Sequence, residues 1–381
     1  MPTKTITPAA KNIPTKIAAL SDLLKKNQTA LNSKTVTAGF DGFVDTNIKI
    51  IKTKSEKQQQ EFFNKIGELG NYILQKKAGS FSLEFEEMGV KTGGNMPIMS
   101  NAMGVLGLNV NCVGAFGYPL IHPAFNTFSP NCSIQSFADP GTATAIELND
   151  GKIILAQMAA LNKKGWNSIK KIIGIQKLVQ MFQQSQLLCM VNWSEIDTST
   201  SIWKGVLKDV LPAYDTAQRN QTAFFDLSDC SKRSNASIKE ALSLIQKFSR
   251  HAKVVLGLNQ NEASLVYKAL HQKSSNKDLL YKGSKIFDSL GIETLVVHSS
   301  KEATGFTKDG CISAKGFHIS NPKISTGAGD NFNAGFCTAH LLNLGMDHCL
   351  IFAHAVAALY VQKGSSPQLK ELIRFLKNNH H

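Results

Sequence analysis

The sequence is organised around one short segment, Ser325-Thr326-Gly327-Ala328-Gly329-Asp330. Its two glycines carry no side chain that would keep a phosphate away from the backbone, and they permit turns in which several N–H groups point the same way. The apolar-rich run that continues from Asn331 to Phe336 predicts a helix, whose N-terminus would add its partial positive charge. The segment therefore predicts an anion-binding turn built from Gly327, Ala328 and Gly329.

Asp330 has two interpretations. A carboxylate beside an anion-binding turn can accept the proton of an attacking hydroxyl, so the residue can act as a general base in phosphoryl transfer. An aspartate after a glycine turn is also a common helix N-cap. This segment by itself is compatible with both roles. The order of the other motifs along the chain favours the role of general base.

The composition is typical of a soluble globular protein: of the 381 residues, 43% are hydrophobic and 18% are charged. The net charge of +14 comes mostly from lysines that are spread along the chain. The sequence lacks runs of basic residues interleaved with aromatic residues, which a protein that binds single-stranded nucleic acid would need. The best apolar run, Leu350 to Val361, is too short to span a membrane. We therefore predict neither nucleic acid nor a membrane as a partner.

The N-terminus and the cysteines predict a cytoplasmic protein. Met1 to Asn12 contains lysines but lacks the apolar core of a secretory signal. The seven cysteines are scattered and form no Cys-x-x-Cys pair, and the ten histidines lack metal-ligand spacing. Reduced thiols are therefore expected, with no disulfide framework and no metal site built from protein ligands alone.

The second half of the chain alternates between buried strands and helices. Strands are expected at 187–191, 223–227, 253–256 and 294–298, after a first strand at 35–40. Such alternation predicts an α/β fold with a doubly wound, mostly parallel sheet that is flanked by helices. Ligands of such sheets collect at the carboxyl ends of the strands, where the polar motifs of this sequence also fall.

Residues 1–34 are polar with a helical pattern and are expected to form an N-terminal extension of a domain that covers 35–381. A small β-lid is expected from about 46–52, 81–90 and 141–157, because apolar and polar residues alternate there and the last part contains an Asp-Gly turn. A helix is expected between its first two parts, at 58–77. A lid of this kind would exclude water from a phosphoryl-transfer site.

Two groups of residues are candidates for binding a polar acceptor. Asp41 and Asp45 are four residues apart among glycines, where carboxylates can accept hydrogen bonds from hydroxyls or serve as turn acids. Gly93, Gly94 and Asn95 precede a helical run, and they either admit a polar ligand or cap that helix.

Asn259 and Glu262 form the pattern Asn-x-x-Glu after a predicted strand. Their simplest interpretation is a helix cap followed by a first-turn acid. The alternative is a role near Mg²⁺, which prefers oxygen ligands and keeps several waters.

In order and spacing these motifs resemble the ribokinase-like (PfkB) carbohydrate kinases over about residues 35–365. The resemblance is most specific at residues 327–330 and extends to 93–95 and 259–262. It implies that the glycine turn is an anion hole and that Asp330 is the catalytic base. It also implies that the acids after the first strand and the Gly-Gly-Asn segment bind the sugar, with Asp45 favoured over Asp41. In the family, the Asn-x-x-Glu motif acts on magnesium and phosphate, largely through water.

Two segments depart from the family pattern. Ile324 stands where the family usually has an acid that helps to form a monovalent-cation site, so potassium activation is not predicted. His298-Ser299-Ser300 stands where the family usually has Thr-x-Gly on the nucleotide side. His298, Ser300 and Gly305 are the candidates on that side, and their contacts to the nucleotide are expected to differ from those of the family.

The resemblance implies a kinase that uses ATP with Mg²⁺ to phosphorylate a hydroxyl of a sugar or a sugar-like compound. A nucleoside kinase of the same fold and a sugar-binding homologue without turnover are the alternatives, and the intact Asp330 argues against the second. The apolar edges of the expected lid could pair between subunits, which would give a homodimer.

Overall fold

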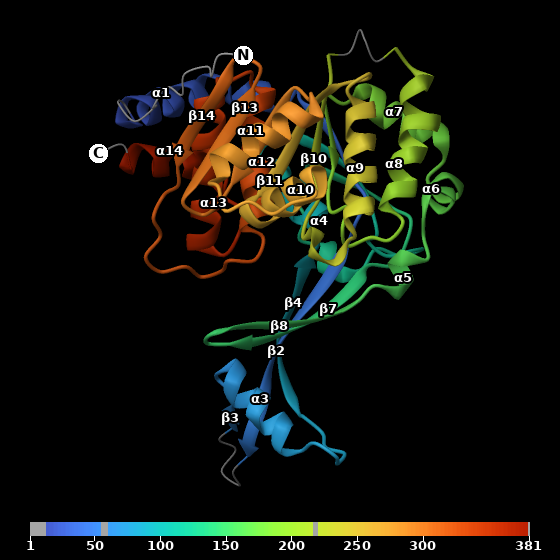
Figure 1. The fold of residues 1–381 in the computed structure, drawn as a ribbon, viewed down its shortest axis with the longest axis vertical. Coiled ribbons are helices and arrows are strands. Elements are labelled where there is room, and N and C mark those ends of the chain that lie inside the picture. The colour runs from blue at the N-terminus through green and yellow to red at the C-terminus, as the bar shows by residue number, and fades with distance from the viewer. Residues whose placement is uncertain (1–12, 55–59, 216–219, 380–381) are drawn as a thin grey trace.

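The structure, a computed structural model, describes residues 13–54, 60–215 and 220–379, which two sheets organise (Figure 1). The larger sheet has nine strands in the order β14-β13-β12-β11-β10-β9-β1-β5-β6. The strands from β12 to β6 are parallel, and β13 and β14 form an antiparallel hairpin at one edge. Their bounds are β1 (Thr35–Gly39), β5 (Asn109–Gly114), β6 (Cys132–Ser136), β9 (Leu187–Met190), β10 (Thr222–Asp226), β11 (Lys253–Asn259), β12 (Thr294–His298), β13 (Glu302–Thr307) and β14 (Gly310–Lys315).

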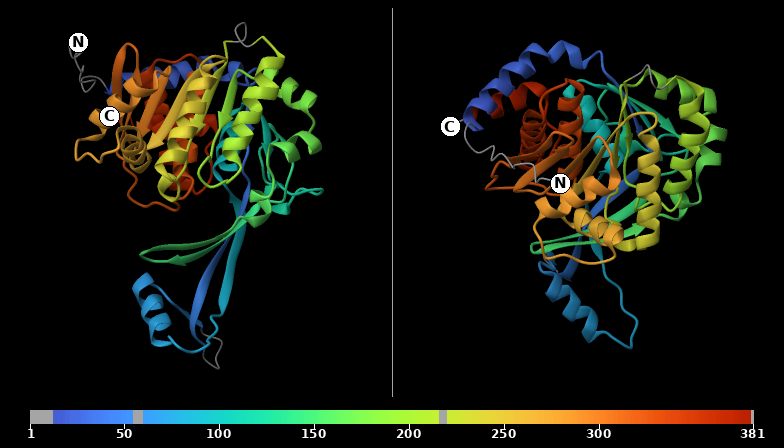
Figure 2. Two further views of the ribbon diagram at one scale, coloured as in Figure 1. Left: turned by 45° about the vertical axis from the view of Figure 1, so that its right-hand side comes forward. Right: turned by 45° about the horizontal axis from the view of Figure 1, so that its top comes forward.

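Helices cover both faces of this sheet (Figure 2). One face carries α5 (Ala159–Asn162), α6 (Trp166–Ile172), α7 (Ile175–Gln184), α8 (Ser199–Gly205), α9 (Asn235–Phe248), α10 (Gln260–His271) and α11 (Leu279–Leu290). The other face carries α1 (Ile13–Lys26), α2 (Gln28–Leu31), α4 (Asn95–Leu106), α12 (Ala328–Leu341), α13 (Met346–Lys363) and α14 (Leu369–Asn378). Short 3₁₀ turns lie at Pro123–Phe125, Leu211–Ala213 and Cys230–Lys232, and a π-helical segment, Val206–Val210, continues α8.

Each face of the sheet buries its own apolar core. On β10, Phe225 points into the core beneath α8 and α9, whereas Phe224 points into the core beneath α12 and α13. Successive side chains of a strand point to opposite faces, so a strand buried on both sides is apolar throughout. This arrangement confirms the predicted α/β fold with a doubly wound, mostly parallel sheet.

The smaller sheet projects from the body as an arm (Figures 1 and 2). It has the order β3-β2-β7-β8, and β4 pairs with β2. The bounds are β2 (Phe43–Lys54), β3 (Gln60–Phe62), β4 (Phe85–Gly93), β7 (Gly141–Leu148) and β8 (Gly151–Gln157). Near the far end of the arm, α3 (Ile66–Gln75) helps to cover a small separate core that contains Ile48, Ile50 and Ile146.

The arm differs from the expectation in two places. The helix expected at 58–77 begins only at Ile66, because the chain from Gln60 first pairs with the long strand β2. Residues 58 and 59 lie outside the described residues. The strand expected from Phe81 begins at Phe85, because Phe81 instead packs its ring against Tyr72 of α3, with 6.0 Å between ring centroids.

Helix α1 lies along α13 and α14 and buries Ile17, Leu20 and Leu24 against them (Figure 1). The first twelve residues of the expected N-terminal extension lie outside the described part of the chain, and the boundary at residue 34 stays a prediction. Among the described helices, none combines the length and the hydropathy needed to cross a bilayer.

Candidate active site

The first turn of α12 begins at Gly327, which is the N-cap residue with φ of 86°. This left-handed conformation favours glycine. A Cβ atom at this position would also lie 2.7 Å from the hydroxyl oxygen of Tyr360, so the local packing excludes a side chain as well. Both reasons are specific to this turn and explain why the segment needs glycine here.

Some backbone N–H groups of this turn have no backbone carbonyl as hydrogen-bond partner. The amide of Ala328 donates to the carbonyl oxygen of Ser325 at 3.2 Å. Within the described residues, the amides of Gly327, Gly329 and Asp330 donate to no carbonyl of the backbone. The Asp330 amide bonds its own carboxylate, so the amides of Gly327 and Gly329 remain as orphan donors at a helix N-terminus, where they form an anion-binding arrangement. Of the three residues predicted to form the anion hole, Ala328 therefore has its amide already engaged.

Asp330 follows in the first turn of α12 and is 8% exposed. Burial, together with the charges of Asp226 and Asp41, raises its pKa well above the usual range, and a hydrogen bond from the Asn95 side chain opposes this shift. Asp330 therefore lies with residues from the ends of β1 and β10 and from the start of α4. A buried carboxylate with a raised pKa is a stronger base than a solvated one, which suits proton abstraction from a hydroxyl.

Asp41 lies just beyond β1 and is completely buried. Its carboxylate accepts hydrogen bonds from the Met96 amide at 2.9 Å and from the Asn192 side chain at 2.7 Å. Burial raises the pKa of Asp41 to about 7, and these hydrogen bonds lower it in part. A Cβ atom on Gly94 would lie 2.6 Å from this carboxylate. Asp41 thus ties the end of β1 to the start of α4 and to the end of β9.

Asp45 lies on β2, where the arm leaves the body, and it is partly exposed. Burial raises its pKa, and the charges of Lys91 and Lys152 lower it in part. A Cβ atom on Gly93 would lie only 2.2 Å from the nearer carboxylate oxygen of Asp45. The Asp45 carboxylate therefore occupies the space that a side chain at position 93 would need, and this contact is the structural reason for a glycine there.

Asn259 and Glu262 form a capping box at the start of α10. The Asn259 side-chain oxygen accepts from the Glu262 amide at 3.0 Å, and one Glu262 oxygen accepts from the Asn259 amide at 2.8 Å. The other Glu262 oxygen accepts from the Asn259 side-chain amide at 2.6 Å. The cap interpretation thus describes their hydrogen bonds, but it does not explain why Glu262 is almost completely buried.

The carboxylate of Glu262 is one of several acids gathered near the start of α12. Burial, and then the charge of Asp226, raise the pKa of Glu262 well above the usual range, and Asp229 and Asp330 add to the shift. Burial also raises the pKa of Asp226 to about 6. Among the described residues, no group of three or more His, Cys, Asp or Glu side chains is arranged to hold a metal ion directly. The mutual repulsion of these acids nevertheless favours a cation held through water.

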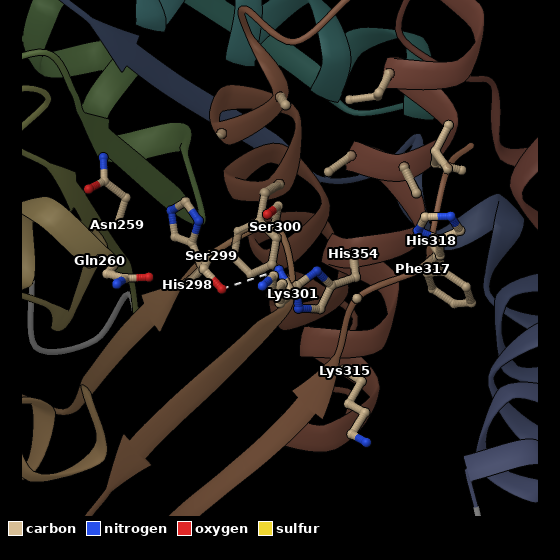
Figure 3. A pocket seen from close by; sticks show the side chains of 18 of the residues that line it. Asn259, Gln260, His298, Ser299, Ser300, Lys301, Lys315, Phe317, His318 and His354 are labelled. Carbon is tan, nitrogen blue, oxygen red and sulfur yellow. Dashed lines mark hydrogen bonds between the residues drawn. The ribbon is translucent and has the colours of Figure 1, made fainter. Parts of the chain in front are cut away.

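A cavity of about 920 Å³ opens beside this turn (Figure 3). Asn259 and Gln260 lie on one side of it and Phe317 and His318 on the other, with His354 between them. Gly329 lines the cavity too, so a ligand there would reach the orphan amides. Its other lining includes apolar groups of α12 and α13, namely Ala328, Phe332, Ala357, Ala358 and Val361.

Two of the three nucleotide-side candidates line this cavity. His298 stacks on Phe332 with 4.4 Å between ring centroids, and burial lowers its pKa to about 3. Ser300 follows in the loop after β12 and is exposed. Gly305 does not line the cavity: it lies in β13, between β12 and the edge strand β14, where a Cβ atom would meet the Met346 side chain at 2.3 Å.

Two site residues were missed from the sequence. Asn192 lies beyond the end of β9 and donates to Asp41, while its own side-chain oxygen is buried without a partner in the described structure. Asp226 ends β10 and accepts from the side chain of Asn333 at 2.6 Å. Each is a polar residue at the end of an apolar strand, and this is the signal that could have identified them.

Known proteins resemble the chain along almost its whole length. The family model described as prokaryotic ketohexokinase matches residues 15–379. A ketohexokinase of Haloferax volcanii is 26% identical over 345 residues, which cover 89% of this chain and 90% of that protein.

Solved structures also match. The ribokinase of Arabidopsis thaliana complexed with ribose and ATP has a TM-score of 0.60 at 17% identity and covers 90% of this chain and 98% of its own. A nucleoside kinase of Burkholderia thailandensis in complex with inosine has a TM-score of 0.61 at 14% identity, with 91% and 99% coverage. At such identities the likeness shows the fold alone, and kinases of sugars and of nucleosides share this fold.

Proposed function

The chain belongs to the prokaryotic ketohexokinase family, so it is an ATP-dependent carbohydrate kinase, and we propose that its acceptor is a ketohexose. One observation carries the assignment of the site. A buried carboxylate, Asp330, lies at a helix N-terminus between acceptor-side residues and a cavity large enough for a nucleotide. Base, anion-binding amides and nucleotide cavity are the parts that phosphoryl transfer to a hydroxyl requires.

In the proposed reaction, Asp330 accepts the proton of one acceptor hydroxyl as its oxygen attacks the γ-phosphorus of ATP. The bond from that phosphorus to the bridging oxygen breaks, and ADP leaves. The orphan amides of Gly327 and Gly329 donate to the oxygens of the transferring group, where negative charge is held during the transfer. Because the amides are fixed before the substrate arrives, no reorganisation is needed at the moment of reaction.

Three side chains are proposed to orient the acceptor: Asp45 from the arm, Asn95 from the start of α4, and Asn192 from the end of β9. The unpartnered side-chain oxygen of Asn192 is an acceptor that a sugar hydroxyl would satisfy. Both carboxylate oxygens of Asp41 already accept hydrogen bonds, one from the Met96 amide and one from the Asn192 side chain, so Asp41 is proposed to position these groups.

Magnesium is proposed to enter the site with ATP. Both carboxylate oxygens of Glu262 accept hydrogen bonds from Asn259. These two residues therefore fit contact with Mg²⁺ through water molecules better than direct ligation of the ion. Bound Mg²⁺ would neutralise charge on the phosphates. Ile324 offers no oxygen in its side chain where the family has an acid, and we propose turnover without a monovalent cation. Equal rates in potassium, sodium and choline chloride would support this, and a rate that requires potassium would refute it.

We also propose that the arm is a lid over the acceptor and that it forms the contact of a homodimer. Its strands expose the large apolar side chains Phe85, Met88, Val90 and Leu155, which water would cover in a monomer. Light scattering of the purified chain would report twice the 41.5 kDa mass of a monomer. A monomer at micromolar concentration would contradict the proposal. No nucleic acid or membrane partner is proposed, and the cytoplasm is the proposed location.

An ADP-release screen tests the proposed substrate. The purified chain receives ATP and Mg²⁺ with ketohexoses, aldoses, pentoses and nucleosides in parallel. Highest kcat/KM with a ketohexose supports the proposal, whereas highest kcat/KM with a nucleoside favours a nucleoside kinase of this fold. Calorimetric binding of a sugar without ADP release would indicate a sugar-binding homologue that lacks turnover.

A further inference from the structure

The turn that bears the orphan amides is held by side chains from outside it. The hydroxyl of Tyr360, on α13, donates to the carbonyl oxygen of Thr326 at 2.8 Å. The next carbonyl oxygen of the turn, that of Gly327, accepts a hydrogen bond from the Asn331 side chain at 2.9 Å. The Ser366 hydroxyl in turn donates to the side-chain oxygen of Asn331 at 2.9 Å. Side chains thus hold two successive carbonyls of the turn, and the Gly327 carbonyl also accepts from the backbone amide of Asn331 at 3.0 Å.

Fixing these carbonyls also fixes amides. The peptide bond is planar and trans, so the N–H of Gly327 points opposite to the carbonyl of Thr326. When Tyr360 holds that carbonyl, the Gly327 amide is directed away from Tyr360. A turn of two glycines is otherwise conformationally free, and an anion hole that had to order itself during each turnover would lose part of its stabilising effect.

We infer that Tyr360 is a positioning residue for phosphoryl transfer, and that the Ser366–Asn331 pair assists it by holding the next peptide. Tyr360 acts through the backbone of Thr326 and Gly327. The inference rests on the proposed role of this turn as the anion hole, and it goes beyond that role by naming the side chains that orient it.

The surroundings of Tyr360 suit this task. Tyr360 is 8% exposed, and many side chains of its helix, such as Phe352 and Val356, are packed in the core beneath α12 and α13, so its ring has little freedom. Burial, with the charges of Asp330 and Asp45, raises its pKa to about 12, so the hydroxyl keeps the proton that it donates at every working pH. A Cβ atom on Gly327 would lie 2.7 Å from the same hydroxyl oxygen, so turn and tyrosine fit each other closely.

The test is steady-state kinetics of Tyr360→Phe, which removes the hydroxyl and keeps the ring. We expect kcat to fall about five- to tenfold, the factor that corresponds to one hydrogen bond of ordinary strength. The KM values for sugar and ATP, and the calorimetric Kd for ATP, should change less than about twofold, because the hydroxyl acts on the transferring group rather than on bound substrates.

Tyr267→Phe is the matched control. Tyr267 lies in α10, is 3% exposed, and has its hydroxyl close to the side chains of Tyr281 and Ser275, but it lines no part of the nucleotide cavity. Removal of the Tyr267 hydroxyl should lower Tm as much as removal of the Tyr360 hydroxyl does, and it should leave kcat unchanged. A drop in kcat found only in Tyr360→Phe would therefore not be a general effect of stability.

Ser366→Ala supplies a second and milder variant, which keeps the inference testable if Tyr360→Phe folds poorly. It should lower kcat about two- to threefold with KM unchanged, because Asn331 loses one of its two fixed partners. A kcat equal to that of the wild type in the folded tyrosine variant, or in both variants, would overturn the inference and leave the proposed function intact. A wild type that phosphorylates no sugar would overturn the proposed function and this inference with it.

Discussion

Replacing Gly93 by alanine is expected to impair the acceptor side of the site through one contact. The added Cβ atom would lie 2.2 Å from one carboxylate oxygen of Asp45 and 2.7 Å from the other. An ordinary contact between carbon and oxygen needs more than 3 Å, so the carboxylate must move by about 1 Å, and a displacement of this size can lower kcat/KM about 10²-fold. The backbone of Gly93 is not in the left-handed region, so alanine itself adds no strain there.

The assay is ADP release at varied sugar and saturating ATP. Gly70→Ala is the matched control, because Gly70 lies in α3 of the same arm and a Cβ there would meet nothing within 4 Å. Its kinetics should equal those of the wild type. The double variant Asp45→Ala with Gly93→Ala should be no worse than Asp45→Ala alone, since the glycine acts only through that carboxylate. Full kcat/KM in Gly93→Ala, or additive losses in the double variant, would refute the reasoning.

Three further predictions concern charge. The rate should fall at acidic pH as Asp330 is protonated. Asp226→Asn should move this acidic limb to lower pH, because the charge of Asp226 raises the pKa of Asp330. A limb that does not move would contradict this. The KM for ATP should stay constant from pH 6 to 8, because burial lowers the pKa of His298 to about 3 and of His354 to about 4, so both stay neutral; a KM that changes with a pKa near 6.5 would contradict it. Glu262→Gln should raise the Mg²⁺ concentration for half-maximal rate about tenfold or more, as loss of groups around a metal does; an unchanged requirement would limit Glu262 to capping α10.

The sequence predicted the parts of the molecule that local chemistry determines. Glycines followed by an apolar run require a turn and then a helix, and the structure has both at Gly327 and α12. The strand at Thr294–His298 was also predicted with its observed bounds. Asn259 and Glu262 show the limit of such reasoning, because a capping box and a role near phosphate use the same two residue types.

Other parts depend on contacts between distant segments. The burial of Asp41 could not be predicted from the sequence, because the groups that bond its carboxylate are 55 and 151 residues away along the chain. The hairpin of β13 and β14 was not predicted, and it places Gly305, a nucleotide-side candidate, against Met346. Tyr360 is far from the glycine turn in sequence, and only the packing of α13 on α12 brings its hydroxyl to Thr326.

The central claim is that Asp330, beside the orphan amides of α12, takes the proton of the acceptor hydroxyl. The most direct measurement is kcat of Asp330→Asn, with Asp347→Asn as control, since Asp347 is also a first-turn aspartate but lies at α13 and pairs with Lys16. We predict that kcat falls by about 10²–10⁴-fold in Asp330→Asn with ATP and sugar binding retained, and that the control is unaffected. Turnover in Asp330→Asn close to that of the wild type would contradict the account.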